Sequence, residues 1–134
     1  LQNLQLDFKG AAEYLSRTGG KFFYFVSRET LDPKARLHAR MIFYGGDDPA
    51  TGSAAGCCAA WMVAHRLAPS DEQVLIEQGT EVHRPSNIFV RATLQPTTSP
   101  NVPQKNRYDN HVVNVRVGGN CVEVLRAQVT LPIA

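Results

Sequence analysis

The sequence predicts an α+β fold in which a mixed, mostly antiparallel β-barrel wraps around a central buried helix. Residues 51–67 (TGSAAGCCAAWMVAHRL) are apolar or small on every face until His65 and Arg66. A helix without a polar stripe is typical of an enclosed position. The rest of the chain carries short segments rich in β-branched and aromatic residues, separated by turn residues. A sheet curled around this helix satisfies both observations.

Composition indicates one ordinary globular domain over residues 1–134, with 43% hydrophobic and 19% charged residues. Fourteen basic residues against twelve acidic ones give a net charge of +2, and they are scattered, so nucleic acid is not an expected partner. No stretch approaches the roughly 20 apolar residues of a membrane span, and no signal-peptide pattern is visible. We therefore expect no membrane partner and a cytoplasmic location.

The first part of the chain predicts one helix and two strands. Apolar residues recur at helical spacing over residues 4–17, and the glycines at 19–20 end that helix. Residues 21–27 (KFFYFVS) predict a buried strand that we expect to lie centrally in the sheet. Residues 40–44 predict a second strand, and the following GGDDP sequence at 45–49 breaks the chain before the helix.

The second part predicts only strands and loops. The expected strands are residues 73–78, 87–93, 111–117 and 122–131. Gly118-Gly119-Asn120 predicts a hairpin turn between the last two of them. Residues 95–110 are rich in Pro, Thr and Asn and predict a loop.

The start of the apolar helix carries the most specific chemistry. Asp48 with Pro49 at the first helical position, or Thr51 and Ser53 one turn later, are residues that cap helices. Free N–H groups at this helix end, the helix dipole, the small Gly52 and the hydroxyl groups together suit a carboxylate or phosphate. We therefore expect a small anionic ligand here.

Two aspartates, Asp47 and Asp48, stand beside this expected anion site. A carboxyl group near a bound anion can have its pKa tuned for general acid or base catalysis. The alternative is that both residues only cap the helix, and the spacing alone leaves both interpretations open.

Other reactive residue types predict structural roles. Cys57 and Cys58 lie inside the helix and are expected to be small core residues, with Trp61 also in the core. His65 suits the C-terminal end of the helix dipole. A solvated turn is expected for Glu77, Glu81, His83 and Arg84. Three cysteines without a pairing pattern indicate a reducing compartment, and the four separated histidines predict no metal site.

Several motifs resemble the phenazine-biosynthesis-like (PhzF-like) isomerases, whose fold is related to diaminopimelate epimerase. The first is residues 40–43 (RMIF) leading into 47–56 (DDPATGSAAG), where the family has Glu-Asp-Pro-(Ala/Val)-Thr-Gly-Ser-Ala. Glu77-Gln78-Gly79 followed by 84–86 (RPS) is the second, and Val117-Gly118-Gly119 is a weaker third. The motifs occur in the family's order, and the resemblance covers nearly the whole chain.

The resemblance implies a protein of two similar lobes with the active site between them. Only the C-terminal lobe is matched, and no segment matches the motif of the family's catalytic glutamate, so the isolated chain is expected to be inactive. Asp48 resembles the family's second active-site carboxylate and Ser53 its active-site serine, while Thr51, Gly52 and Ala54 resemble ligand-binding groups. Asp47 and His83 depart from the family pattern, which has Glu and Gly there.

Three hypotheses of function follow. In the first, the chain is the C-terminal lobe of an isomerase or epimerase that moves a proton on a small carboxylate-bearing molecule, without cofactor or metal. In the second, the lobe binds a small anion or a protein and performs no chemistry. In the third, two copies pair as a homodimer that imitates the two-lobed protein, so the expected partner is either the missing N-terminal lobe or a second copy.

Overall fold

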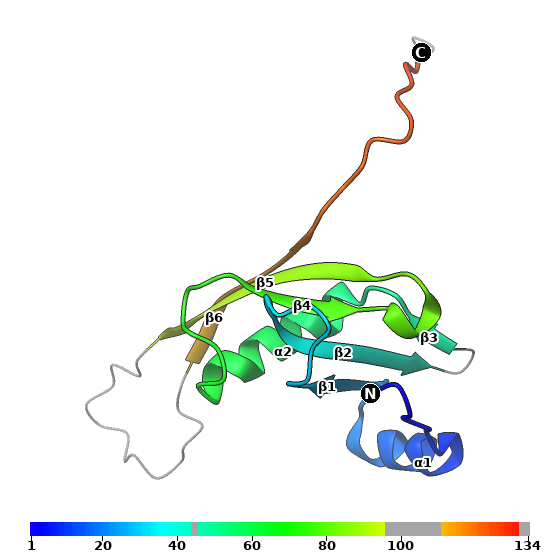
Figure 1. Cartoon of the computed structure of the whole chain (residues 1–134), viewed down its shortest axis with the longest axis vertical. Coiled ribbons are helices and arrows are strands. Elements are labelled where there is room, and N and C mark those ends of the chain that lie inside the picture. Colours follow the sequence, from blue (N-terminus) through cyan, green and yellow to red (C-terminus); the bar gives the residue numbers. More distant parts are fainter. Residues whose placement is uncertain (44–45, 96–110, 132–134) are drawn as a thin grey trace.

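The computed structural model describes residues 1–43, 46–95 and 111–131, which form a six-stranded curled sheet with two helices (Figure 1). The elements are α1 (Phe8–Thr18), β1 (Phe23–Ser27), β2 (Ala35–Phe43), β3 (Gly46–Asp48), α2 (Gly52–Ala64), β4 (Val74–Gln78), the 3₁₀ turn η1 (Thr80–Val82), β5 (Ser86–Gln95) and β6 (His111–Gly119). The predicted α+β class with a sheet curled around a helix is therefore confirmed.

The sheet has the order β1-β2-β4-β5-β6, and the short β3 also pairs with β2. Only the β2–β4 pair is parallel, because α2 lies in the connection between these strands and returns the chain to the same end of the sheet. All other pairs are antiparallel, as predicted. Strand β2 begins at Ala35, earlier than the predicted residue 40, because its first half pairs with β4.

Strand β1 lies at an edge of this sheet, so the prediction that it is central was wrong. All five of its residues are only half-buried. Tyr24 packs against the core, but Phe23 packs on Phe25 and on Tyr14 of α1, with ring centroids 5.8 Å apart in both pairs. Aromatic content predicted the strand correctly but not its place in the sheet.

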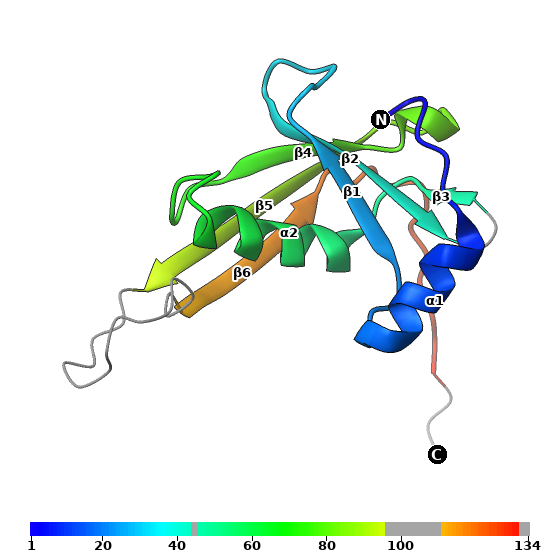
Figure 2. The same ribbon diagram turned by 90° about the horizontal axis from the view of Figure 1, so that it is seen from below.

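Helix α1 begins at Phe8, later than the predicted residue 4, because Asp7 caps it. The Asp7 carboxylate accepts from the Lys9 N–H at 3.1 Å and from the Gly10 N–H at 3.2 Å. The helix ends at Gly19, whose φ of 73° is the left-handed conformation that glycine favours. None of its residues is buried, and it lies outside the sheet (Figure 2).

Helix α2 is enclosed on one side only, so the prediction of complete burial was wrong. Its buried residues are Ala55, Gly56, Cys58, Ala59, Met62 and Val63. Ser53 and Cys57 are exposed, and Trp61, expected in the core, is 44% exposed. The sheet ends at β1 and β6 and leaves the remaining side of α2 open (Figure 2). Apolar side chains on every face indicated burial, but they do not ensure that enough strands exist to provide it.

The core lies between this buried side of α2 and the inner face of the sheet. It is formed by Leu37, Ala39, Ala55, Cys58, Ala59, Met62, Val63, Ala68, Ile76, Ile88, Val90 and Ala92. The small residues of α2 let strands approach, as expected: a Cβ added at Gly56 would lie 3.3 Å from the Val117 side chain of β6.

Among the described residues, no helix is long and apolar enough to cross a membrane.

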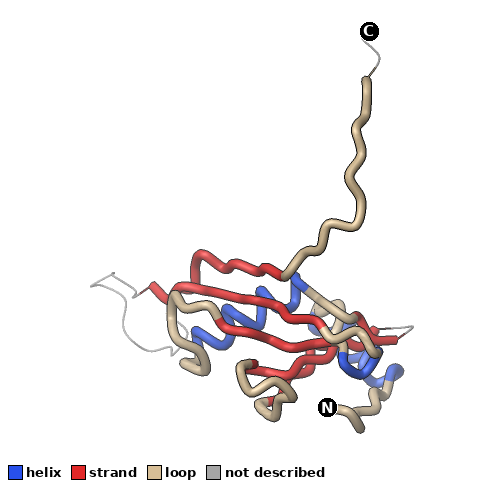
Figure 3. The backbone as a smooth tube through the Cα atoms, turned by 45° about the horizontal axis from the view of Figure 1, so that its top comes forward, coloured by secondary structure: helices blue, strands red, loops and turns tan. Residues whose placement is uncertain are grey.

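The end of the chain departs from the prediction. Residues 120–131 form no strand, and Gly118 and Gly119 do not form a turn but pair with Phe89 and Ile88 as the last residues of β6. The segment 120–131 is exposed and extends away from the domain (Figures 1 and 3). Of the predicted loop at residues 95–110, Gln95 ends β5, and the rest lies outside the described residues.

Gly79 joins β4 to the η1 turn and provides a test of this fold. Its φ is +87°, and a Cβ there would clash with the Arg84 carbonyl and lie 2.6 Å from the Pro49 carbonyl. We expect Gly79→Ala to lower the free energy of unfolding by about 2 kcal/mol, because both the backbone conformation and the space exclude a side chain. Chemical denaturation measures this change.

Gly118→Ala is the matched control, since nothing lies within 4 Å of a Cβ at that position. We expect that variant to stay within about 0.5 kcal/mol of the wild type. Equal losses in the two variants would contradict the close backbone contact at Gly79.

Candidate functional site

The turn between β3 and α2 differs in detail from the expected helix cap. Asp48 is the last residue of β3 and α2 begins at Gly52, so neither Asp48 nor Pro49 starts the helix. Thr51 occupies the N-cap position, but its side chain makes no capping hydrogen bond. Instead the Thr51 hydroxyl donates to Oδ2 of Asp48 at 2.8 Å. Threonine therefore fixes the aspartate and leaves the N–H groups of the helix end without a side-chain cap.

Gln78, the last residue of β4, holds this turn from inside the protein. Its Nε2 donates to the Asp48 carbonyl at 2.6 Å and to the Thr51 hydroxyl oxygen at 2.9 Å. Its Oε1 accepts from the Thr51 N–H at 3.3 Å and from the Tyr24 hydroxyl at 3.0 Å. The Gln78 side chain is fully buried, with 1% of the residue exposed. Four hydrogen bonds thus satisfy a buried amide that would otherwise destabilise the core.

The surrounding groups keep this network in one protonation state. Burial, together with the nearby Cys58 and Asp48, raises the pKa of Tyr24 above its ordinary value. The Tyr24 hydroxyl therefore stays protonated and donates, which assigns Oε1 of Gln78 as the acceptor. Burial, with the adjacent Cys57, also raises the pKa of Cys58 to about 11, so this thiol is a core residue as predicted and not a nucleophile. Cys57 is exposed, contrary to the core prediction.

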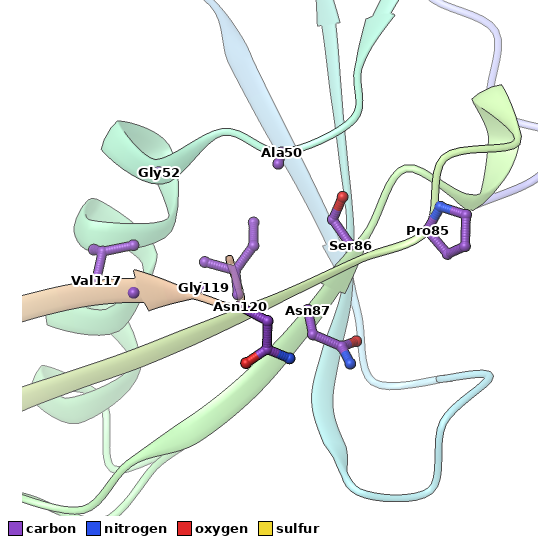
Figure 4. Close-up of a pocket in the computed structure, with 10 residues that line it drawn as sticks. Ala50, Gly52, Pro85, Ser86, Asn87, Val117, Gly119 and Asn120 are labelled. Atoms are coloured by element: carbon purple, nitrogen blue, oxygen red, sulfur yellow. The ribbon is translucent and has the colours of Figure 1, made fainter. Parts of the chain in front are cut away.

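A pocket of about 630 Å³ opens beside the start of α2 (Figure 4). Three segments line it: the turn before α2, the start of β5 and the end of β6. The lining residues are Ala50, Gly52, Pro85, Ser86, Asn87, Ile88, Val117, Gly118, Gly119 and Asn120. The β5–β6 pairing brings Asn87 and Asn120 to neighbouring strand ends (Figure 4).

Of the predicted site residues, Gly52 lines this pocket. Thr51 is buried behind it, Asp48 and Ala54 are half-buried, and Ser53 is exposed on the first turn of α2. The first turn of α2 contains no acidic residue, so the positive end of its dipole is not offset from within the helix. With the amides of Asn87 and Asn120, the pocket offers hydrogen-bond donors suited to a small anion.

Sequence reasoning missed a buried ionic cluster formed by His38, Glu77 and Glu81. The His38 Nδ1 lies 2.8 Å from Glu77 Oε1, and its Nε2 lies 2.8 Å from Glu81 Oε1. All three side chains are less than 10% exposed, which corrects the expected solvated turn for both glutamates. The second oxygen of Glu81 is buried and has no hydrogen-bond partner among the described residues. His38 and Glu77 are 39 positions apart in the sequence, which explains why no spacing indicated the pair.

Hydrogen bonds lower the pKa of both glutamates. Burial acts in the opposite direction on Glu77, but the backbone N–H groups of Leu31 and Asp32 and the His38 ring outweigh it. For Glu81, burial is likewise outweighed, mainly by the hydrogen bond with His38. Both carboxylates are therefore charged at neutral pH, and they connect the 31–32 loop, β2, β4 and the η1 turn.

The η1 turn also explains a departure from the family pattern. His83 adopts a φ of 56°, the left-handed conformation that glycine takes most easily, and its N–H donates to the Thr80 carbonyl. The turn thus keeps a shape suited to glycine although histidine occupies the position.

At the other end of the domain, the His65 N–H donates to the Trp61 carbonyl at the C-terminus of α2, where the sequence predicted a dipole partner.

The described residues contain no group of three His, Cys, Asp or Glu side chains arranged to hold a metal ion. The described residues form an α+β domain whose curled sheet covers one helix and whose pocket opens at the start of that helix. The family model described as phenazine biosynthesis-like protein matches residues 1–127, and this chain belongs to that family.

Named relatives and a solved structure agree with this assignment. The chain is 37% identical over 106 residues to an uncharacterised isomerase of Mesorhizobium japonicum, covering 75% of this chain and 30% of the relative. It is 48% identical over 46 residues to the trans-2,3-dihydro-3-hydroxyanthranilate isomerase of Pseudomonas aeruginosa, covering 34% of this chain and 16% of that protein. A PhzF-family phenazine biosynthesis protein of Bacillus anthracis superposes with a TM-score of 0.60 at 21% identity, covering 69% of this chain and 33% of that structure, which shows the fold. This chain therefore spans less than a third of the length of the Mesorhizobium relative.

The Gln78 network predicts a large effect of one substitution. Gln78→Leu should lower the free energy of unfolding by about 3 kcal/mol, because the Thr51 N–H and the Asp48 carbonyl lose a buried partner that leucine cannot replace. Urea denaturation measures the change. Tyr24→Phe, which removes one of the four hydrogen bonds, should cost about 1 kcal/mol. A Gln78→Leu loss no greater than that of Tyr24→Phe would disprove the central role of the amide.

The His38 cluster predicts loss of stability in acid. The folded-state pKa of Glu77 and of Glu81 lies below the unfolded value. Their contribution to the free energy of unfolding is therefore complete above about pH 5, and it is lost as the pH falls through their folded-state pKa values. Denaturation midpoints measured from pH 7 to pH 3 should fall steeply. Glu81→Gln should reduce this pH dependence, whereas Glu13→Gln, on the exposed face of α1, should leave it unchanged. A Glu81→Gln profile parallel to the wild type would refute the assignment.

Proposed function

We propose that this chain is the C-terminal lobe of an isomerase or epimerase that moves a proton on a small carboxylate-bearing substrate without cofactor or metal. The observation that carries the proposal is the arrangement of the 48–52 turn: a fixed carboxylate, Asp48, next to a helix start that lines a pocket. Family membership and the isomerase names of two relatives support the reaction class.

In this proposal the two parts of the turn act on different parts of the substrate. The first N–H groups of α2, at Gly52, Ser53 and Ala54, bind the substrate carboxylate, and the Ser53 hydroxyl adds a further donor. Asp48 transfers a proton to or from one carbon of the substrate, as one of two acid/base groups. The electron pair left on carbon is delocalised toward the bound carboxylate, where the positive end of the helix stabilises it.

The Thr51 hydroxyl orients Asp48 for this role. Its hydrogen bond occupies Oδ2, while among the described residues Oδ1 accepts only from the Ala50 N–H, at 3.4 Å. Oδ1 is therefore the oxygen that we assign to proton transfer, and a substrate in the pocket must extend past Ala50 to reach it. Because Gln78 holds the Thr51 side chain in turn, the carboxylate position depends on the core of the lobe.

The other half of the site belongs, in this proposal, to an N-terminal lobe. The chain covers 30% of the Mesorhizobium relative and 33% of the Bacillus structure, so each is long enough to contain a second lobe. The resemblance places a catalytic glutamate there. Two acid/base groups on opposite sides of the substrate would allow one to remove the proton and the other to deliver it.

The test uses the complete two-lobed protein and trans-2,3-dihydro-3-hydroxyanthranilate, the compound in the name of the Pseudomonas relative. We expect Asp48→Asn to slow isomerisation and the uptake of solvent deuterium at least about 100-fold, because an amide cannot transfer the proton. Rates are followed by absorbance and by NMR. Asp71→Asn, an exposed aspartate paired with Arg91, is the matched control and should leave both rates unchanged.

Exchange at the wild-type rate in Asp48→Asn would refute the catalytic assignment. Saturable binding of small carboxylates without exchange in the wild-type protein, with binding weakened by Ser53→Ala, would support the alternative of an anion-binding domain. No turnover of this compound but Asp48-dependent turnover of another carboxylate would keep the reaction class and change the substrate.

A further inference from the structure

Arg40 binds the residue that precedes Asp48 in the sequence. Strand β2 pairs antiparallel with β3, and this pairing places Met41 opposite Asp48. From the position before Met41, the Arg40 Nε donates to Oδ2 of Asp47 at 2.5 Å. The two side chains are 15% and 9% exposed. This ion pair is therefore largely shielded from water, where opposite charges attract each other more strongly than at an exposed surface.

Arg40 also binds backbone groups outside the sheet. Its Nη1 donates to the Leu1 carbonyl at 2.8 Å and to the Leu4 carbonyl at 3.3 Å. With the bond to Asp47, three hydrogen bonds to two segments fix the planar guanidinium group. Because the guanidinium is fixed, the Asp47 carboxylate that it binds is fixed as well.

Asp47 and Asp48 carry their carboxylates on opposite faces of β3, because they are consecutive residues of a strand. Asp47 bonds to Arg40, whereas Asp48 bonds to Thr51 beside the start of α2. Two ionised carboxylates close to each other disfavour each other's charged form. The positive charge of Arg40 offsets the charge of Asp47, so the pair as a whole places little net charge beside Asp48.

The other titratable groups around this turn do not provide a positive charge. The Tyr24 hydroxyl, which interacts with Asp48, and the Cys58 thiol both stay neutral because burial raises their pKa. The η1 turn contacts β3 and contributes the carboxylate of Glu81. The pKa of Glu81 is lowered, against the effect of burial, by hydrogen bonds and by the charge of Arg40. Among the residues that the structure describes, Arg40 is therefore the cation that offsets negative charge next to Asp48.

We propose that Arg40 is a positioning residue of the candidate site: it holds Asp47 in place and offsets its charge, so that Asp48 is ionised without a like charge beside it. Arg40 is not among the residues that line the pocket, so it acts through Asp48 and not on the substrate. Its role in the reaction rests on the proposed function, whereas the charge balance around Asp48 can be measured without a substrate.

A carbon-13 NMR titration of the Asp48 carboxyl group tests the charge balance in the chain of residues 1–134, with Asp48→Asn to assign the signal. Arg40→Gln leaves the negative charge of Asp47 without a partner, so the Asp48 midpoint should move to higher pH by at least about 0.5 pH unit. Asp47→Asn leaves the positive charge of Arg40 and should move the midpoint to lower pH. In the double variant Arg40→Gln/Asp47→Asn, the midpoint should return close to the wild-type value.

Three controls separate charge from folding. Arg40→Lys keeps the charge but not the guanidinium geometry, so the Asp48 midpoint should stay near the wild-type value even where the free energy of unfolding falls. Arg91→Gln removes the exposed ion pair with Asp71 and should leave the midpoint unchanged. Asp47→Asn preserves the shape of the side chain, so it tests the proposal by itself where Arg40→Gln does not fold.

Isomerisation by the complete two-lobed protein tests the role in the reaction. Arg40→Gln should lower kcat at least about tenfold with little change in KM, because the group that transfers the proton is disturbed and the pocket is not. Arg40→Gln/Asp47→Asn should recover most of this loss, since two neutral amides can hydrogen-bond and leave no charge to offset.

An Asp48 midpoint that is unchanged in both single variants would overturn the proposal, as would a shift of the same sign in every variant. A kcat that survives Arg40→Gln but not Asp48→Asn would overturn the role of Arg40 in the reaction. If Asp48→Asn itself leaves isomerisation unchanged, the proposed function fails, yet opposite shifts in the two single variants would still support the charge balance.

Discussion

The buried side-chain amide of Gln78 makes four hydrogen bonds, and these bonds arrange the candidate site. The partners come from β1, from the end of β3 and from the N-cap of α2, so one side chain joins three separate elements. The next residue, Gly79, allows the Pro49 backbone to pass close behind the amide. The Gln-Gly pair thus sets both the position of the turn and how closely it approaches β4. Without it, the hydrogen bonds that join this turn to β4 would be lost.

Adjacent residues of β4 support two different networks because strand side chains alternate between faces. Gln78 bonds to the turn before α2, while Glu77 bonds to His38 and to the 31–32 loop. His38 in turn contacts Glu81 in the η1 turn, which leads directly into the Pro85–Ile88 wall of the pocket. A short strand therefore connects a buried ionic cluster on one face with the candidate site on the other. The shape of the pocket wall depends on the same cluster that acid should disrupt.

The parts of the fold that the sequence predicted well are those set by local chemistry. The α2 helix, the turn before it and strands β4, β5 and β6 follow from composition and turn residues close in sequence. Contacts between distant residues were not predictable: Tyr24 and Gln78 are 54 residues apart, and His38 and Glu81 are 43 apart. The errors at β1 and at the open side of α2 have a related cause. A local pattern of apolar residues indicates that a surface is to be buried, but the order of strands in the whole sheet determines which element buries it.

The same limit applies to the candidate site: the sequence indicated which residue types lie there but not the contacts that each of them makes. It left two interpretations of the aspartates open, acid/base catalysis beside a bound anion or helix capping alone. In the structure Asp48 ends β3, three residues before the helix cap, and its Oδ2 is bonded to Thr51. Asp48 thus lies outside the helix, while Gly52, the first residue of α2, lines the pocket. A substrate carboxylate at the helix start would then meet a different part of this turn from the Asp48 side chain, and the buried Gln78 amide holds both parts in place.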